Sequence, residues 1–212
     1  MSNPTFSIIV PAHNASGYIH KLLDSIDSQS FRDFELIVIC DDCSDDTKSI
    51  AKEYGAITCD VPFHRDGLSR DSGLDIASGQ WILFADDDDW FIHDYCFHEL
   101  AKRTASTTCD AIPFGIIFRT RGYVPPSVHD FLRPRIDHVW STCWRRTAVE
   151  KAGARFGDAV FSSDTYFLAA MKRYKTSFEL LDMPIYYYNF MRPGSQTDLF
   201  CKGIIRQSPV AE

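Results

Sequence analysis

Short apolar runs alternate with amphipathic stretches through the first 90 residues of the chain. Apolar runs of this length are typical of strands that are buried on both faces. Between them, apolar residues recur at helical spacing, first at Ile19, Leu22, Leu23 and Ile26. The pattern predicts strands over residues 6–10, 34–40, 56–61 and 81–85, and helices over 19–26, 47–54 and 68–77. Ser44 or Asp45 is the expected N-cap of the second helix.

This alternation of strands and helices predicts an α/β fold with a mostly parallel central sheet, arranged as a Rossmann-like αβα sandwich. The length of 212 residues suits one domain. Beyond residue 90 the pattern weakens, and it predicts helices over 95–102 and 164–174 and strands over 111–118 and 185–190. Residues 119–137 hold three prolines and little periodicity, which indicates a lid, a binding loop or a disordered segment.

The composition supports a packed core, because 45% of the residues are hydrophobic and 14% are aromatic. The formal net charge of −7 argues against a general nucleic-acid-binding protein. Basic residues do concentrate between Arg119 and Arg146, interleaved with aromatic residues. Such a patch can face a diphosphate, an anionic acceptor or a membrane surface, or it can be a solvated face.

The seven cysteines show no framework spacing, and no signal peptide or apolar run of 18 residues is found. We therefore expect a cytoplasmic protein with free thiols. Cys40 and Cys43 form a C-x-x-C pair, but a zinc site would need a second pair. We interpret both as small core or loop residues.

Four consecutive carboxylates, Asp86 to Asp89, directly follow the predicted strand over 81–85. Adjacent anions repel one another, so some of them must be solvated, protonated or bound to a cation. Their oxygens favour hard cations such as Mg²⁺, Mn²⁺ or Ca²⁺. A solvated acidic turn that caps the next helix, and a phosphatase with Asp86 as nucleophile, are the alternatives. A calcium loop is excluded, because its sixth and twelfth positions would be Phe91 and Phe97.

A second acidic pair, Asp41 and Asp42, follows the predicted strand over 34–40. In a parallel sheet the carboxyl ends of the strands share one edge, so the two acidic clusters can meet in one crevice. The chain has no G-x-G-x-x-G sequence and no Walker loop, which argues against those two nucleotide cradles.

Three blocks of the sequence, residues 7–14, 34–47 and 69–90, resemble family 2 glycosyltransferases of the GT-A fold in order and spacing. Weaker similarity continues in residues 139–146, 156–167 and 186–195. The resemblance implies transfer of a sugar from a nucleotide-sugar donor with inversion at the anomeric carbon. It also implies a donor-binding half over about residues 1–105 and an acceptor-facing half over about 106–200.

The resemblance places the donor base and ribose beside Pro11, Ala12 and Asn14. Asp41 takes the position that accepts a hydrogen bond from uracil. Cys40 replaces a family acid there, and Asp42 is expected to compensate for the missing carboxylate. Arg70 stands in the family's Ala-Arg-Asn segment and is expected to hold the base or a phosphate.

Asp86 to Asp88 match the family's Asp-x-Asp signature. Asp88 is the expected ligand of Mn²⁺ or Mg²⁺, and Asp86 is expected on the ribose or on a metal-bound water. Asp89 is expected to orient the sugar or the neighbouring loop. Asp87 is also placed in the donor site, as the position whose side chain matters least.

Inverting transfer needs a general base, and the resemblance assigns that role to Asp164, with Asp158 as the fallback. From the residues alone, Asp164 is equally a helix cap. Arg192 is expected to clamp the diphosphate or to be an exposed surface residue. Trp140 and Trp144 either line the acceptor site or belong to the core. His13 and His64 receive no role.

The expected acceptor is a polysaccharide, another glycan or a lipid-linked sugar. A lipid-linked acceptor would bring the protein to the inner face of the membrane without an anchoring segment. A nucleotidyltransferase and a non-catalytic nucleotide-sugar-binding module are the rival functions. The sequence leaves the sugar, the linkage and the oligomeric state open.

Overall fold

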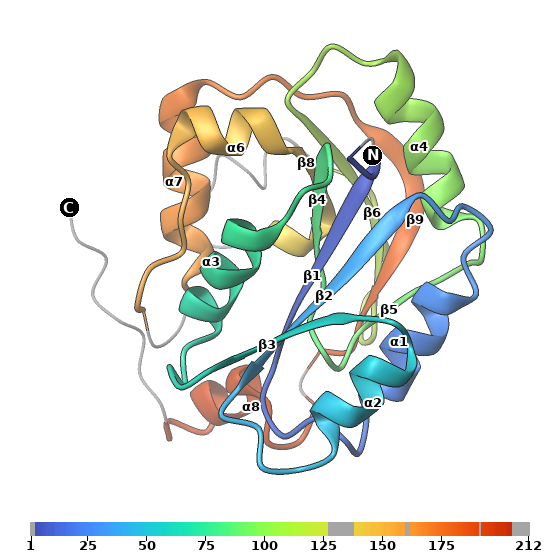
Figure 1. Ribbon diagram of the computed structural model, residues 1–212. Coiled ribbons are helices and arrows are strands. Elements are labelled where there is room, and N and C mark those ends of the chain that lie inside the picture. The colour runs from blue at the N-terminus through green and yellow to red at the C-terminus, as the bar shows by residue number, and fades with distance from the viewer. Residues whose placement is uncertain (1–2, 127–137, 160–161, 191, 205–212) are drawn as a thin grey trace.

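A mixed sheet is the centre of the computed structural model, which describes residues 3–126, 138–159, 162–190 and 192–204 (Figure 1). Its nine described strands follow the order β3-β2-β1-β4-β8-β6-β9-β5, with β7 paired to β6. The strands are β1 (Phe6–Ala12), β2 (Phe34–Asp41), β3 (Ile57–Val61), β4 (Trp81–Phe84), β5 (Trp90–Phe91), β6 (Ala111–Phe118), β7 (Gly122–Val124), β8 (Thr142–Arg145) and β9 (Leu181–Tyr188). The helices are α1 (His20–Asp27), α2 (Thr47–Glu53), α3 (Asp66–Ile76), α4 (Cys96–Ser106), α6 (Arg146–Ala152), α7 (Asp164–Tyr174) and α8 (Gln196–Cys201), with a 3-10 turn η1 (Val139–Ser141).

The first four strands form the parallel part of the sheet, as the sequence predicts. β1 pairs with β2 on one side and with β4 on the other, and β2 pairs with β3. Every residue of β1 and β4 is buried, which explains why these segments are almost purely apolar. The strand order reverses beside β1, so a crevice opens at the carboxyl ends of β1 and β4.

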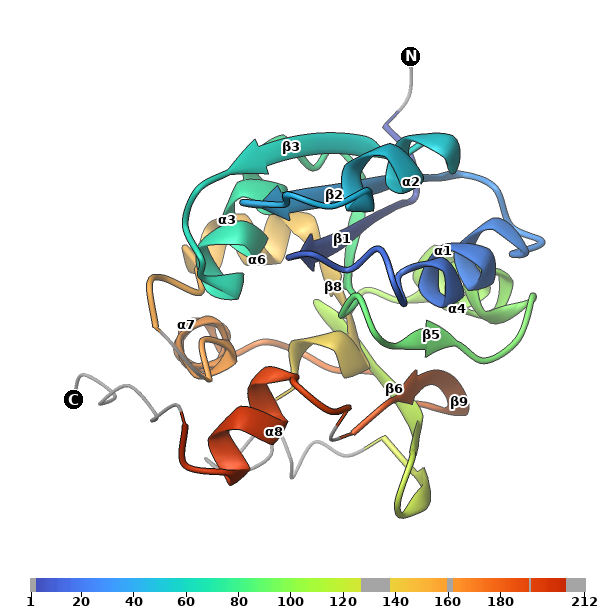
Figure 2. The same cartoon turned by 90° about the horizontal axis from the view of Figure 1, so that it is seen from below.

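The helices cover both faces of the sheet and complete the predicted αβα sandwich. α3, α6 and α7 lie on one face, and α1, α2 and α4 lie on the other (Figures 1 and 2). α8 lies at the carboxyl-end edge of the parallel strands (Figure 1). Within the described ranges, no helix combines the length and the apolar character needed to span a bilayer.

The second half of the sheet differs from the sequence prediction in several elements. The pattern misses β5, β7, β8, α6 and α8, because segments of two to seven residues contain too few periods to be recognised. β9 begins at Leu181 instead of residue 185, since Asp182 and Pro184 interrupt its apolar pattern. Within the predicted loop over 119–137, residues 122–124 form β7, while residues 127–137 lie outside the described part of the chain.

The start of α2 also differs in detail from the prediction. Asp46 occupies the N-cap position and makes no side-chain capping bond. Asp45 instead accepts hydrogen bonds from the backbone N–H groups of Thr47 and Ser16, both at 3.0 Å. Asp45, one residue before the N-cap, therefore provides the hydrogen-bond acceptor for the first backbone N–H of α2. It also connects the segment after β1 to the segment after β2.

The amino ends of the parallel strands are held by a polar cluster around Gly79. The Glu35 carboxylate accepts hydrogen bonds from Ser7 Oγ at 2.6 Å and from the backbone N–H of Ser78 at 2.7 Å. Gly79 lies so close to β1 that an added Cβ would be 2.5 Å from the Ser7 backbone nitrogen and 2.7 Å from the Phe6 carbonyl carbon. This close approach aligns the start of β4 with β1.

Gly79→Ala is expected to lower the free energy of unfolding by about 2–3 kcal/mol, because the new methyl group meets backbone atoms that cannot move aside. The exposed Gly17→Ala is the matched control, since a Cβ there meets nothing within 4 Å. Urea unfolding of both variants measures the difference. Equal stability of the two would contradict the packing argument.

Candidate active site

A cavity of about 850 Å³ opens at the carboxyl ends of the parallel strands. Its volume lies within the range of small-molecule sites. The predicted residues on its wall are Pro11, Ala12, Asp41, Arg70, Asp86, Asp87, Asp88, Trp140, Asp164 and Arg192. Five other predicted residues are not part of the described wall, namely Asn14, Asp42, Asp89, Trp144 and Asp158. The topology therefore brings most of the predicted site into one cavity.

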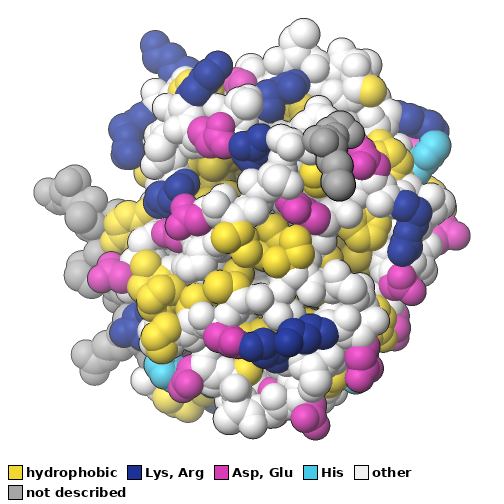
Figure 3. All heavy atoms as spheres, viewed as in Figure 1, with side chains coloured by type: hydrophobic (Ala, Val, Ile, Leu, Met, Phe, Trp, Pro, Cys, Tyr) yellow, Lys and Arg dark blue, Asp and Glu magenta, His cyan; other side chains and the backbone are white. Residues whose placement is uncertain are grey.

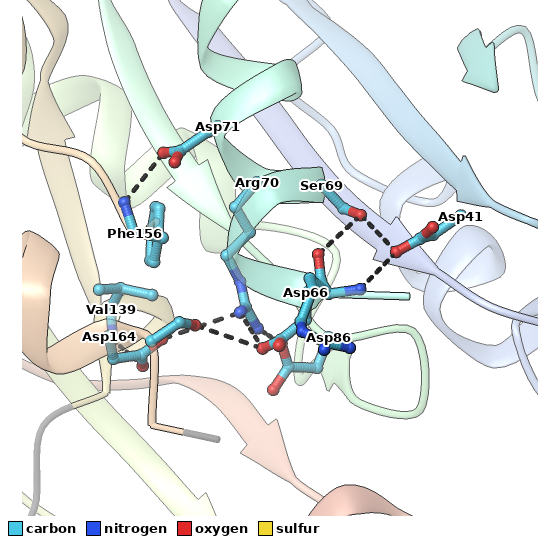
Figure 4. A network of polar contacts seen from close by, with 11 residues as sticks. Asp41, Asp66, Ser69, Arg70, Asp71, Asp86, Val139, Phe156 and Asp164 are labelled. Atoms are coloured by element: carbon cyan, nitrogen blue, oxygen red, sulfur yellow. Dashed lines mark hydrogen bonds and ion pairs between the residues drawn. The ribbon is translucent and has the colours of Figure 1, made fainter. Parts of the chain in front are cut away.

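Arg70 is the centre of the polar network in this cavity (Figure 4). Its guanidinium binds Asp66 at 2.5 Å and Asp86 at 2.6 Å, and it lies 3.8 Å from Asp164. The residue is only 5% exposed. The resemblance predicts a contact between Arg70 and the base or a phosphate, but the structure instead engages its two terminal nitrogens with three carboxylates.

The charge of Arg70 opposes the effect of burial on the pKa values of Asp86 and Asp164. Burial raises the pKa of Asp86, and the nearby guanidinium counteracts this rise. Asp86 comes from the segment after β4, Asp66 from the start of α3 and Asp164 from the start of α7. One cation therefore links three separate elements of the fold.

Asp164 is the first residue of α7, but it does not cap that helix. Ser163 occupies the N-cap position and makes no side-chain capping bond. Asp164 Oδ2 instead accepts a hydrogen bond from the backbone N–H of Val139 at 3.1 Å. Burial raises the pKa of Asp164 to about 7, with Arg70 opposing the rise. Its position on the cavity wall and this pKa suit a group that accepts a proton near neutral pH.

Asp158, the fallback base, is exposed and does not contribute to the described cavity wall. Of the two candidate bases, Asp164 is therefore the one on the described cavity wall.

The Asp41 carboxylate has hydrogen-bond donors on all sides. It accepts from the backbone N–H groups of Phe63, His64 and Arg65 at 2.7–2.8 Å and from Ser69 Oγ at 2.9 Å. Burial alone would raise the pKa of Asp41, but these donors hold it below its ordinary value. Four bonds use the acceptor capacity of an ionised carboxylate. A uracil N–H would have to replace one of them, so the predicted base contact of Asp41 stays a prediction.

Asp88 and Arg192 meet at the predicted metal position. Arg192 Nε donates a hydrogen bond to Asp88 Oδ2 at 2.7 Å, and the guanidinium lies 3.9 Å from the centre of the Tyr18 ring. Arg192 is therefore a cavity residue and not a free surface arginine. A phosphate that binds here would lie next to the Arg192 guanidinium and the acidic run Asp86 to Asp89.

The donor atoms at this position fit a divalent cation that is shared with a substrate. Asp86 and Asp88 both present carboxylates to the cavity. The described residues contain no group of three or more His, Cys, Asp or Glu side chains arranged to hold a metal ion. One or two carboxylates, completed by substrate phosphates and water, are the usual protein contribution to a Mg²⁺ site. The residues present are thus compatible with such an ion.

Asp89 lies beneath the cavity wall. Its side chain is fully buried, and Oδ1 accepts a hydrogen bond from the backbone N–H of Asn189 at 2.8 Å. The Asn189 side chain in turn donates to the Asp88 carbonyl at 3.2 Å. The structure therefore places the Asp89 side chain on the neighbouring segment, which is one of its two expected partners, and its expected role toward the sugar stays a prediction. Asp87 lies on the wall, where burial raises its pKa and the adjacent acids raise it further.

His13 and His64, to which the sequence analysis assigns no role, line the end of the cavity next to β1 and β2. Their rings lie 5.6 Å apart, and His13 Nδ1 is 2.5 Å from the Asp41 carbonyl oxygen. The Asp42 carboxylate lies 3.2 Å from His64 Nε2 and does not reach the described wall. The expected compensation for Cys40 by Asp42 is therefore indirect. The available sequence signal was the position of His13 directly after a buried strand.

Asn14, expected at the base and ribose, faces the segment after β2. Its Oδ1 accepts a hydrogen bond from the backbone N–H of Ser44 at 2.8 Å. The residue supports the end of β1 and the loop after it, where Ala12 and His13 line the cavity.

The two tryptophans separate into different roles. Trp144 is fully buried and donates a hydrogen bond to the Val139 carbonyl at 3.0 Å, so it belongs to the core. Trp140 contributes to the cavity wall, where its ring stacks on His138 at 4.5 Å and contacts Tyr188 at 4.6 Å. The aromatic end of the cavity is thus built from η1 and β9.

The described basic residues between Arg119 and Arg146 do not form one patch, and residues 127–137 of this segment lie outside the described part of the chain. Arg121 lines the cavity, whereas Arg145 lies over the Trp81 ring and Arg146 pairs with Glu150. On the face shown in Figure 3, Lys and Arg side chains are scattered among Asp and Glu, with no continuous basic stripe on its described part.

Comparison with known proteins matches the family model for glycosyl transferase family 2 to residues 7–175. The chain is 28% identical over 221 residues to the uncharacterized glycosyltransferase EpsJ of Bacillus subtilis, covering 92% of this chain and 64% of EpsJ. It is 37% identical over 93 residues to the GalNAc(5)-diNAcBac-PP-undecaprenol beta-1,3-glucosyltransferase of Campylobacter jejuni, covering 41% of this chain and 30% of that enzyme. The chain thus spans less than two thirds of each relative.

Two solved structures share the fold. TarS of S. aureus, residues 1–349 in complex with UDP-GlcNAc, has a TM-score of 0.80 and 22% identity, covering 93% of this chain and 61% of that one. The mannosyltransferase PcManGT of Pyrobaculum calidifontis, in complex with GDP-Man and Mn²⁺, has a TM-score of 0.71 and 17% identity, covering 92% and 59%. The predicted GT-A fold is thereby confirmed.

Arg70→Ala is expected to lower the free energy of unfolding by about 3–5 kcal/mol at neutral pH, because it leaves buried carboxylates without their cation. Arg155→Ala is the matched control, since Arg155, between α6 and α7, makes an exposed ion pair at 3.0 Å with Asp75 of the same helix α3. This control should cost less than about 1 kcal/mol. Urea unfolding at several pH values measures both variants. The cost of Arg70→Ala should shrink as the pH falls and the acids become protonated, and a cost independent of pH would contradict the electrostatic explanation.

Proposed function

Because this chain belongs to glycosyltransferase family 2, we propose that it transfers a sugar from a UDP-linked donor to a hydroxyl group of a glycan or lipid-linked acceptor, with inversion. The observation that carries this proposal is the position of Asp164. It lies on the wall of the same cavity as the acidic run after β4, and one guanidinium lies close to both Asp164 and Asp86. A base for the acceptor and carboxylates for the donor thus face a common space.

The nucleotide is expected at the end of the cavity formed by Pro11, Ala12, His13 and Asp41. Flat rings and backbone groups from the ends of β1 and β2 suit a planar base. The diphosphate would then extend toward Asp88, where Arg192 can donate charge-assisted hydrogen bonds to it. Arg192 has to leave Asp88 for this contact, while the Tyr18 ring can keep its guanidinium in the cavity.

The transfer step needs a proton acceptor on the side of the sugar opposite the departing diphosphate. The acceptor hydroxyl oxygen bonds to the anomeric carbon as the bond from that carbon to the diphosphate oxygen breaks. Asp164 takes the hydroxyl proton during this attack. Val139, whose N–H binds Asp164 Oδ2, orients the carboxylate so that its other oxygen remains near Arg70 and the cavity.

Asp88 and Asp86 would hold the Mn²⁺ or Mg²⁺ ion, which neutralises charge on the departing diphosphate when it is bound. The donor atoms of the two side chains support this assignment, as does the Mn²⁺ in the PcManGT complex. Asp89 contributes indirectly, because its bond to Asn189 anchors the segment that supports Asp88.

The acceptor is expected at the aromatic end of the cavity, beside Trp140 and Tyr188. Sugar rings pack on aromatic faces, and Asp164 lies on the same wall. The undecaprenol-linked substrate in the name of the C. jejuni relative supports a lipid-linked acceptor as one member of this class. Such an acceptor would bring the protein to the inner face of the membrane as a peripheral protein.

A thermal-shift screen of nucleotide sugars, with and without Mn²⁺, tests donor binding. UDP-sugars at about 100 times their Kd are expected to stabilise the protein by about 2.7 kcal/mol, which raises Tm by about 5–10 °C. Asp88→Asn should remove the Mn²⁺-dependent part of this shift, whereas the exposed control Asp94→Asn should keep it. If no nucleotide sugar changes Tm, the proposed function is wrong.

Asp164→Asn is expected to lower the rate of transfer by about 10²–10⁴-fold while UDP-sugar binding is retained, because it removes only the proton acceptor. Asp158→Asn is the control that should keep the rate. Only the ionised carboxylate accepts a proton, and the pKa of Asp164 is raised to about 7. The rate of the unaltered protein should therefore rise about tenfold per pH unit below pH 7 and level off above it. Full activity of Asp164→Asn would overturn the base assignment and support a different base.

A further inference from the structure

Cys40 and Cys43 lie at the carboxyl end of β2, next to the cavity. Cys40 is fully buried in β2, one residue before the strand ends. Cys43 is half-buried in the bend that follows. Asp41, which lines the cavity, lies between them in the sequence. Across the sheet, Cys40 is paired in register with Ala12 of β1, which also lines the cavity.

Both cysteines lie next to Ala12. Cys40 is the register partner of Ala12 in the sheet, and the Cys43 thiol donates to the Ala12 carbonyl oxygen with an Sγ–O distance of 3.3 Å. Between the two cysteines the chain bends sharply at Asp42, whose φ of 52° lies in the left-handed region. The two cysteines are therefore neighbours at the end of β2, and a disulfide between them would close across this bend.

The two thiols are chemically unequal. The hydrogen bond from Cys40 lowers the pKa of Cys43 to about 7, and the same bond raises the pKa of Cys40. A thiolate is the nucleophilic form of cysteine, and its reactivity also depends on access. Cys43 is the accessible member of the pair, and Cys40 lies beside it as the resolving thiol.

The bend that carries Cys43 supports the cavity wall. Besides the Cys43–Ala12 bond, the Ser44 N–H donates to Asn14 Oδ1 at 2.8 Å, and the Ser16 N–H donates to Asp45 Oδ2 at 3.0 Å. These bonds dock the segment after β2 onto the end of β1 and the loop that follows it, where Pro11, Ala12 and His13 line the cavity. Of the three bonds, the one from Cys43 depends on a thiol hydrogen.

We propose that Cys40 and Cys43 form a reversible disulfide on reaction with a hydroperoxide, and that this disulfide weakens nucleotide binding. The Cys43 thiolate attacks the peroxide oxygen, which gives a sulfenic acid and releases hydroxide that takes up the thiol proton as water. Cys40 sulfur then displaces a second water from the Cys43 sulfenic acid. Two thiols are oxidised and one hydrogen peroxide is reduced, so that a disulfide and two waters are formed.

The disulfide changes the cavity through the Ala12 contact. Cys43 loses the hydrogen that it donates to Ala12, and its sulfur is drawn toward Cys40. The loop after β1 then has one support fewer at the end of the cavity where the base is expected. The effect on binding rests on the proposed function, whereas formation of the disulfide does not.

The test exposes the reduced protein to one equivalent of hydrogen peroxide and then measures two quantities. Peptide mass spectrometry is expected to show a disulfide between Cys40 and Cys43, with a loss of two hydrogens. Isothermal titration with UDP is expected to show a Kd about fivefold higher after oxidation, the effect of losing one hydrogen bond. Dithiothreitol should restore both quantities.

Two variants control the experiment. Cys43→Ser should form no such disulfide, and its Kd for UDP should be the same before and after peroxide. Cys109→Ser, which alters a half-buried cysteine between α4 and β6, should respond to peroxide as the unaltered protein does.

Absence of the disulfide between Cys40 and Cys43 would overturn the proposal, and so would an equal Kd for UDP in the oxidised and reduced proteins. If the reduced protein binds no UDP, the donor assignment fails, and the effect of oxidation on binding fails with it. The mass measurement would still decide whether this pair is a site of oxidation.

Discussion

The guanidinium of Arg70 lies where the start of α3, the acidic run after β4 and the start of α7 meet, and it binds or neighbours a carboxylate from each of them. Partly buried carboxylates this close together repel one another when ionised and are costly to desolvate without a cation among them. The arrangement is possible because Arg70 stands one helical turn after Asp66, so that both side chains point to the same side of α3. The cavity wall therefore depends on one buried charge.

A second constraint comes from the parallel strands. β1 is paired on both sides and fully buried, so the segments that follow β1, β2 and β4 emerge together at one edge. Hydrogen bonds then hold these segments to other parts of the chain. Asp41 accepts from the backbone before α3, and Asp89 accepts from the backbone after β9. Acids that the family resemblance places on the donor are thus also structural acceptors. In this protein the support of the cavity and its chemistry use the same side chains.

Much of the fold could be predicted because it depends on local patterns. The buried runs of β1, β2 and β4 and the helical spacing in α7 each contain enough residues to show a period. The short elements β5, β7 and β8 could not be predicted in this way, since two to four residues do not distinguish a strand from a loop. At the site, most of the residues that were predicted from position after a strand and from family resemblance lie on the cavity wall. His13 and His64 were missed because a single histidine in a loop does not by itself distinguish a site residue from a surface residue, although His13 directly follows the buried strand β1.

By itself, the sequence determined the parallel core, the edge at which the acidic residues emerge and the family, because hydrophobic period and motif spacing are properties of neighbouring residues. Only the tertiary structure decided which partner each charge has. Arg70 binds acids from separate elements, Asp164 binds Val139 and does not cap its helix, and Asp89 faces inward. These pairings join residues up to 100 positions apart, and their energies depend on distance and burial, which no local pattern contains.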